Sequence, residues 1–145
     1  MNERNIFRHL VLQGVLCLAA GLGSLTALGA DDASDLEKLA GTWNFVQPAG
    51  EPARGKFAVV FKGDTIAFVT ASGQRTEGKF KLDPAQDPKT MDIDMRGKSL
   101  TLAIYQLEEG TLKLCHYLGP KAAKERPKTI AADKETVVGI FKREP

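Results

Sequence analysis

The stretch Leu-Ala-Gly-Thr-Trp at residues 39–43 ends on the only tryptophan of the chain and opens its first run of alternating apolar and polar residues. Trp43 and Phe45 fall on one face of an extended strand, and Asn44 falls on the other, because successive side chains of a strand point to opposite faces. Short runs of the same kind follow, separated by Gly, Pro and Asp turns. This pattern is typical of a β-sandwich or β-barrel.

Eight such runs are predicted as strands, and hairpin-length links join most of them. Their ranges are 42–47, 57–62, 65–70, 75–82, 90–95, 99–107, 111–117 and 136–143. No segment has the amphipathic crossover helix that parallel pairing requires. One or two helical turns are expected from Asp31 to Leu39, packed on the barrel end through Leu36 and Leu39. Because closure removes exposed strand edges, the sequence predicts an all-β, small antiparallel up-and-down barrel with a short N-terminal helix.

Composition and charge are typical of one globular domain and indicate no charged partner. The 145 residues are 43% hydrophobic and 26% charged, which excludes disorder, and their 20 basic and 18 acidic side chains are scattered. The run from Lys121 to Lys128 is interpreted as a solvated loop. A nucleic-acid partner is not expected, because the aromatic residues do not interleave with basic ones.

The first 29 residues have the three parts of a secretory signal peptide. Basic Arg4 and Arg8 precede the apolar stretch 10–20, and small residues lead to a predicted cleavage after Gly29. The mature domain would then be residues 30–145, exported to the periplasm, the cell envelope or the extracellular space. Cleavage after Ala30 and an uncleaved membrane anchor are the alternatives. A spanning helix is disfavoured because glycines and a glutamine dilute the stretch, so no stable span is expected after cleavage.

Two cysteines are present, and only Cys115 would remain after cleavage. No internal disulfide is then possible, and Cys115 is interpreted as buried packing. Cys17 is a poor lipoprotein cysteine, because Leu16 precedes it where a small residue is required.

No motif indicates catalysis, a metal site or a cofactor. His116 follows Cys115 directly, but neighbours on a strand point to opposite faces and cannot form a dyad. Asp92 and Asp94 share a face, which suits either a solvated acidic pair or a calcium site. Phosphate loops, nucleophile elbows and zinc-protease motifs are missing from the sequence. The protein is therefore predicted not to be an enzyme.

Leu36 to Lys142 resembles the lipocalin-like domain of a family of secreted and cell-envelope planctomycete proteins. The resemblance rests on the start at residues 39–43, on Gly78–Pro84 with Pro88–Asp92, and on residues 104–107 leading to Thr-Leu-Lys-Leu-Cys at 111–115. Arg126-Pro127 and the closing Phe-Lys-Arg at 141–143 also fit. The resemblance implies a fold but no established activity.

The wider lipocalin comparison implies how one barrel end is closed. In lipocalins a Gly-x-Trp of the first strand packs beneath a basic side chain of the last strand through cation–π and hydrogen-bond contacts. Gly41 and Trp43 supply the first part, and Lys142 or Arg143 is expected to supply the second.

The expected function is binding of a small apolar or amphipathic ligand inside the barrel. Apolar walls and polar rim groups are assigned from strand alternation. The predicted wall residues are Phe61, Phe68, Phe80, Met91 and Leu102, and the predicted rim residues are Tyr105, His116 and Tyr117. Binding predicts an enclosed apolar cavity of at least ~300 Å³.

The alternative is a barrel filled by its own side chains that acts as a cell-envelope interaction module. Small barrels have interiors just wide enough for side chains to fill, and this chain has many large inward residues. Such a module would bind a protein partner through its loops, such as Gln47–Gly55 or Gly119–Thr129.

Overall fold

The computed structural model describes residues 30–46 and 55–145. The predicted signal peptide, most of the Gln47–Gly55 loop and the cleavage site at Gly29 lie outside these residues. In the described ranges, no helix is both long and apolar enough to span a membrane.

One helix, eight strands and one 3-10 helix make up the described part of the chain. In order they are α1 (Ala30–Leu39), β1 (Gly41–Val46), β2 (Phe57–Lys62), β3 (Thr65–Thr70), β4 (Arg75–Asp83), β5 (Lys89–Asp94), β6 (Leu100–Glu108), β7 (Thr111–Tyr117), η1 (Gly119–Ala123) and β8 (Thr136–Arg143). The strands lie within one or two residues of the predicted ones. The short helix η1 replaces part of an expected loop, and Pro120 lies in its first turn, where a missing N–H is tolerated.

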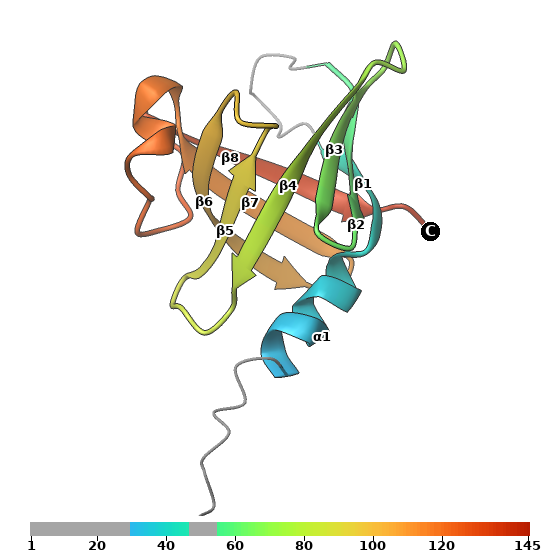
Figure 1. Cartoon of the computed structure of the whole chain (residues 1–145), viewed down its shortest axis with the longest axis horizontal. Coiled ribbons are helices and arrows are strands. Elements are labelled where there is room, and N and C mark those ends of the chain that lie inside the picture. Colours follow the sequence, from blue (N-terminus) through green and yellow to red (C-terminus); the bar gives the residue numbers. More distant parts are fainter. Residues whose placement is uncertain (1–29, 47–54) are drawn as a thin grey trace, which may run out of the picture.

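The strands form a closed antiparallel barrel in sequence order, as predicted. Each strand pairs with the next, and β8 returns to pair with β1, with Trp43 opposite Arg143. Figure 1 shows α1 beneath one end of this barrel. The fold is therefore the all-β, up-and-down, lipocalin-like barrel with a short N-terminal helix.

The half of the barrel nearer α1 is filled by apolar side chains. Phe61 of β2 and Phe80 of β4 meet edge to face, with their ring centroids 5.1 Å apart. The buried core of the whole barrel consists of Leu39, Trp43, Val59, Phe61, Ile66, Phe80, Leu82, Met91, Ile93, Ala103, Tyr105, Leu112, Leu114 and Phe141, of which Ile93, Leu114 and Phe141 extend it toward the opposite end. The end of the interior nearer α1 therefore has the packing that small barrels achieve with side chains alone.

Helix α1 is attached to the barrel by a polar contact as well as an apolar one. Asp35 is buried, and its Oδ2 accepts hydrogen bonds from the Tyr105 hydroxyl at 2.7 Å and from Lys89 Nζ at 2.8 Å. Leu39 is fully buried, as expected. Leu36, which is also expected to pack there, is only partly covered and remains 37% exposed. Of the α1 side chains that the structure describes, Asp35 and Leu39 are buried against the barrel.

The stability contributed by Asp35 is expected to depend on pH. Burial alone would raise the pKa of Asp35, but the hydrogen bonds from Lys89 and Tyr105 outweigh it, so that the pKa lies below its ordinary value of 3.8. A carboxyl with a lowered folded-state pKa stabilises the fold above its unfolded pKa, and this contribution disappears as the pH falls through the folded value.

We therefore expect Asp35→Asn to lower the free energy of unfolding by about 1–2 kcal/mol at neutral pH, with a deficit that shrinks below about pH 4. Urea denaturation from neutral to acidic pH measures this difference. Glu37→Gln, on the exposed side of the same helix, is the matched control and should change little. A deficit of the same size at every pH would contradict the assignment.

Candidate ligand-binding site at the barrel mouth

The end of the barrel next to α1 is closed by Trp43 and Arg143. The Trp43 indole is buried, and its N–H donates to the Leu39 carbonyl at 2.7 Å. The Arg143 guanidinium lies 4.7 Å from the centroid of the indole and donates to the carbonyls of Ala40 and Lys38. Cation–π contact and hydrogen bonds thus hold the last strand to the chain that precedes the first.

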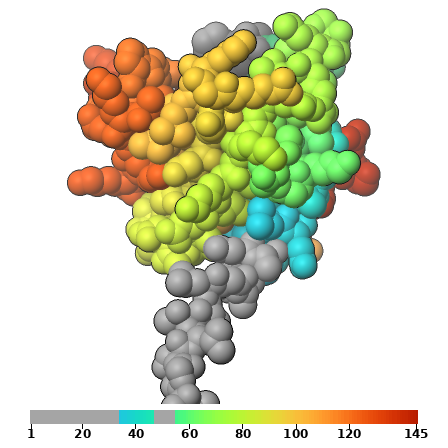
Figure 2. All heavy atoms as spheres, viewed as in Figure 1, coloured from blue at the N-terminus to red at the C-terminus, as the bar shows by residue number. Residues whose placement is uncertain are grey.

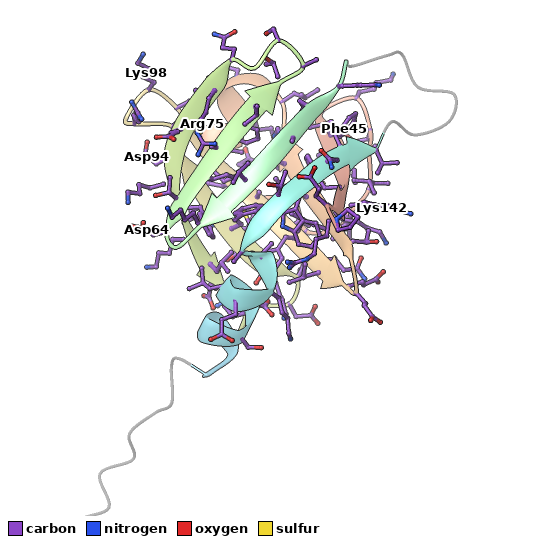
Figure 3. All side chains as sticks on the ribbon, turned by 90° about the vertical axis from the view of Figure 1, so that its right-hand side faces the viewer. Phe45, Asp64, Arg75, Asp94, Lys98 and Lys142 are labelled. Atoms are coloured by element: carbon purple, nitrogen blue, oxygen red, sulfur yellow. The ribbon has the colours of Figure 1, made fainter. Side chains whose placement is uncertain are left out.

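Gly41 and Lys142 have different parts in this closure. Gly41 has φ +120°, which side-chain-bearing residues rarely adopt, and Arg143 Nη1 would lie 3.6 Å from a Cβ at this position. The Gly in Gly-x-Trp is therefore required by the backbone. Lys142 pairs with Asn44 in the β1–β8 ladder and points away from the barrel, as Figure 3 shows. Of the two basic residues expected at this position, Arg143 is the one over the indole.

The opposite end of the barrel, its mouth, holds an apolar pocket of about 180 Å³. It lies where β1 and β7 end and where β2, β6 and β8 begin. Three phenylalanines form much of its wall: the Phe45 and Phe57 rings stack at 4.5 Å, and both meet Phe141 edge to face at 5.7 Å. The lining consists of Phe45, Phe57, Phe68, Ile93, Met95, Thr101, Leu114, His116, Val137, Gly139 and Phe141. The pocket is smaller than the expected enclosed cavity, because the core fills the rest of the interior.

Two of the predicted site residues line this mouth pocket. Phe68 lies in its wall, and His116 brings an imidazole to it. Phe61, Phe80 and Met91 also point inward, but they belong to the buried core nearer α1 and do not line the pocket. Strand alternation therefore predicts that these residues point into the barrel. It does not predict how far along the barrel axis they lie.

Three predicted site residues lie elsewhere, and their assignments are wrong. Leu102 is on the outer face, opposite Asp92, whereas its neighbour Thr101 lines the pocket. Tyr105 points inward but is buried at the end near α1, where its hydroxyl reaches Asp35. Tyr117 is followed by η1, and Lys121 Nζ lies 4.0 Å from the centroid of its ring. None of the three borders the mouth pocket.

Several residues that line the pocket are not among the predicted ligand contacts. Phe45 and Phe57 point inward and lie near strand ends at the mouth. Thr101 and Val137 also line the pocket. The available signal is topological: a residue at the end of β1 or the beginning of β2, β6 or β8 has to lie at the mouth in an up-and-down barrel.

The outer face of β5 and β6 is covered by the connection from β7 to β8. Arg126 donates to Asp92 Oδ1 and to the Ala103 carbonyl, both at 2.5 Å, and Pro127 is buried. Figure 2 shows this connection (orange) beside β5 and β6 (yellow) on the surface. Arg126-Pro127, one of the motifs of the family resemblance, therefore attaches the connection to the barrel wall.

Cys115 lies beneath the same connection. The thiol is buried near the Thr129 and Ala131 carbonyls, at 3.7 and 3.8 Å, and burial raises its pKa. A raised thiol pKa disfavours the reactive thiolate. Because His116 faces the mouth pocket, the two neighbours point to opposite sides of the barrel wall.

Asp92 and Asp94 do not converge on a common ligand. Asp92 pairs with Arg126, and Asp94 Oδ1 accepts a hydrogen bond from the Gly97 amide at 2.6 Å. Across residues 30–46 and 55–145 there is no cluster of three or more His, Cys, Asp and Glu side chains that could hold a metal ion.

A larger groove of about 530 Å³ lies outside the barrel, between the β4–β5 connection and residues 126–128. Its lining is mixed and charged, with Asp83, Asp87, Arg126 and Lys128 among its residues. Small-molecule sites are mostly apolar with a few placed polar groups, which describes the mouth pocket better than this groove.

Comparisons of the chain with family models, with curated proteins and with solved structures found no match to any of them.

Proposed function

We propose that the protein is an exported, non-catalytic member of the planctomycete lipocalin-like family that binds a small apolar or amphipathic ligand in the mouth pocket. The observation that carries this proposal is the apolar, aromatic-lined pocket at the end of the barrel opposite α1, next to the buried core. Binding would be passive: the walls remove apolar ligand surface from water, and the polar side chains Thr101 and His116 orient a polar group.

The size of the pocket limits what enters it. A volume of about 180 Å³ is below the ~300–1,000 Å³ that is typical of small-molecule sites. The ligand is therefore a compact molecule, or a longer one of which only the apolar end is enclosed. Phe61 and Phe80 bar deeper entry, because they already fill the interior nearer α1.

The first test is native mass spectrometry of the secreted protein, purified without refolding. We expect a stoichiometric small-molecule adduct. Phe68→Trp, which enlarges a pocket wall, should reduce or abolish the adduct. Leu100→Trp is the matched control, because it places an indole on an exposed outer position, and it should keep the adduct. A protein that stays free of adduct after incubation with a lipid and pigment extract would contradict ligand binding.

The second candidate function is an interaction module of the cell envelope. It is favoured by the filled half of the barrel and by the charged outer groove beside Arg126 and Lys128. A partner protein would then contact the β4–β5 connection and residues 126–128. Loss of partner capture in Lys128→Glu, with an unchanged melting temperature, would support this function over ligand binding.

A further inference from the structure

The mouth pocket presents one imidazole nitrogen whose hydrogen-bonding state follows from its partner. His116 Nδ1 lies 2.7 Å from the Tyr117 carbonyl oxygen. A carbonyl oxygen only accepts, so Nδ1 carries the proton and donates it. In the neutral ring Nε2 is then the acceptor, and within the described residues it makes no hydrogen bond. Nε2 is therefore the atom that His116 can offer to a ligand.

No other group of the described pocket lining ionises. Phe45 of β1, Phe57 of β2 and Phe68 of β3 line the pocket from strands that do not pair with β7, while Thr101 of β6 and Val137 of β8 line it from the two strands that do. The lining contains no carboxylate, lysine or arginine among the described residues. A charge that forms on His116 thus has no partner in the lining, and a bound ligand would have to supply one.

Cationic side chains lie in the next depression along the rim. A groove lined by Arg75, Glu77, Arg96 and Lys98 shares Met95 with the mouth pocket. Glu77 accepts from both arginines, at 2.7 Å from Arg75 and 3.0 Å from Arg96, and Asp94 adds a second carboxylate at the end of β5. Figure 3 shows Arg75 and Lys98 on the same side of the barrel. Three cations and two carboxylates thus lie along this part of the rim.

We propose that the ligand of the mouth pocket is a small apolar carboxylic acid whose carboxyl group pairs with His116. This inference rests on the proposed ligand-binding function and adds the chemical class of the ligand. The hydrocarbon part lies among Phe45, Phe57 and Phe68, and one carboxyl oxygen meets Nε2.

The proposal predicts that protons are taken up when the ligand binds. When a carboxylate from solution binds beside the neutral imidazole, the complex takes up one proton from water. The bound pair is then a carboxylate beside an imidazolium. Such a charge-assisted hydrogen bond is about twice as strong as a neutral one, and the apolar surroundings reduce its screening. An alcohol of the same shape would bind without proton uptake and without the charge-assisted bond.

Isothermal titration calorimetry with matched probes tests the proposal. Straight-chain carboxylates from butanoate to octanoate are compared with the corresponding primary alcohols at one mildly alkaline pH. Each titration is repeated in two buffers of different ionisation enthalpy, because the difference reports the protons taken up. We expect the best carboxylate to bind at least about tenfold more tightly than its alcohol, with close to one proton taken up.

Two variants separate His116 from the other polar group of the pocket. His116→Gln keeps a hydrogen-bonding side chain but cannot hold the proton, so it should abolish proton uptake and weaken carboxylate binding about tenfold while alcohol binding changes less than about threefold. Thr101→Val should keep the proton uptake. Circular dichroism checks that both variants fold. If His116→Gln does not fold, the proton uptake of the wild-type protein still tests the proposal.

Alcohols that bind as tightly as carboxylates, without proton uptake, would overturn the proposal and leave the ligand-binding function standing. Failure of every probe, together with an adduct-free protein in the mass spectrometry experiment, would remove the ligand-binding function and this inference with it.

Discussion

Replacement of Trp43 by alanine is expected to lower the free energy of unfolding by about 3–5 kcal/mol. The indole is almost fully buried at the end of the barrel next to α1. Its removal leaves a cavity, breaks the hydrogen bond to the Leu39 carbonyl and takes away the ring beneath Arg143. These losses coincide at the place where the first strand, the last strand and α1 meet.

Urea denaturation followed by circular dichroism measures the effect, because the variant has no other tryptophan to report by fluorescence. Trp43→Phe is the control that keeps an aromatic ring but loses the indole N–H, and we expect about half the loss or less. A loss below about 1 kcal/mol for Trp43→Ala would mean that this end of the barrel repacks without its indole.

The second large effect is expected at Gly78 of β4. A Cβ at this position would come closer to the Asp94 carbonyl oxygen than real Cβ atoms approach, and would lie 2.8 Å from Met95 Sδ. The carbonyl belongs to the backbone of β5, which pairs with β4, so it cannot move without disturbing that pairing. We expect Gly78→Val to cost about 3 kcal/mol, at the upper end of the usual range for overpacking.

Thr76→Val is the matched control for this change. It places the same side chain on the same strand two residues away, at an exposed position, and should alter the free energy of unfolding by less than about 0.5 kcal/mol. Equal effects of the two substitutions would show that the strand propensity of valine, and not the close approach of β5, determines the change in the free energy of unfolding. Thermal melting of both variants beside the wild type is sufficient to distinguish these results.

The strands were predictable because their signal is local. Alternation puts Phe57, Val59 and Phe61 on one face of β2, and the turn at Gly63 and Asp64 leads directly into β3. A one-sided apolar face also fixes the direction in which each side chain points. The order of the strands around the barrel then follows from short links between neighbours.

The candidate site was less predictable because β6 is apolar on both faces. Leu100, Leu102 and Ile104 point outward, whereas Ala103 and Tyr105 point inward. Alternation cannot choose between two apolar faces. The outer face of β6 is apolar because the connection carrying Arg126 and Pro127 covers Ile104, which is 1% exposed. No feature of β6 itself reveals this cover.

The attachment of α1 was hidden for a related reason. Asp35 and Tyr105 are 70 residues apart in the chain, and Asp35 is as polar as the exposed residues around it. Local patterns favoured Leu36 for the contact with the barrel. A buried carboxylate is tolerated there only because partners from β5 and β6 reach it, and a single sequence does not show such pairing.

The seam between β1 and β8 also has a kinetic consequence. Trp43 pairs with Arg143, 100 positions later in the chain, so the ring of strands closes through a contact of very high sequence separation. A contact of such high sequence separation forms late, because the entropy of closing the intervening chain must be overcome before the contact is made. Until β8 takes its place, β1 and β7 each present an unpaired edge to other chains. The interval before ring closure is therefore when this protein is most exposed to aggregation.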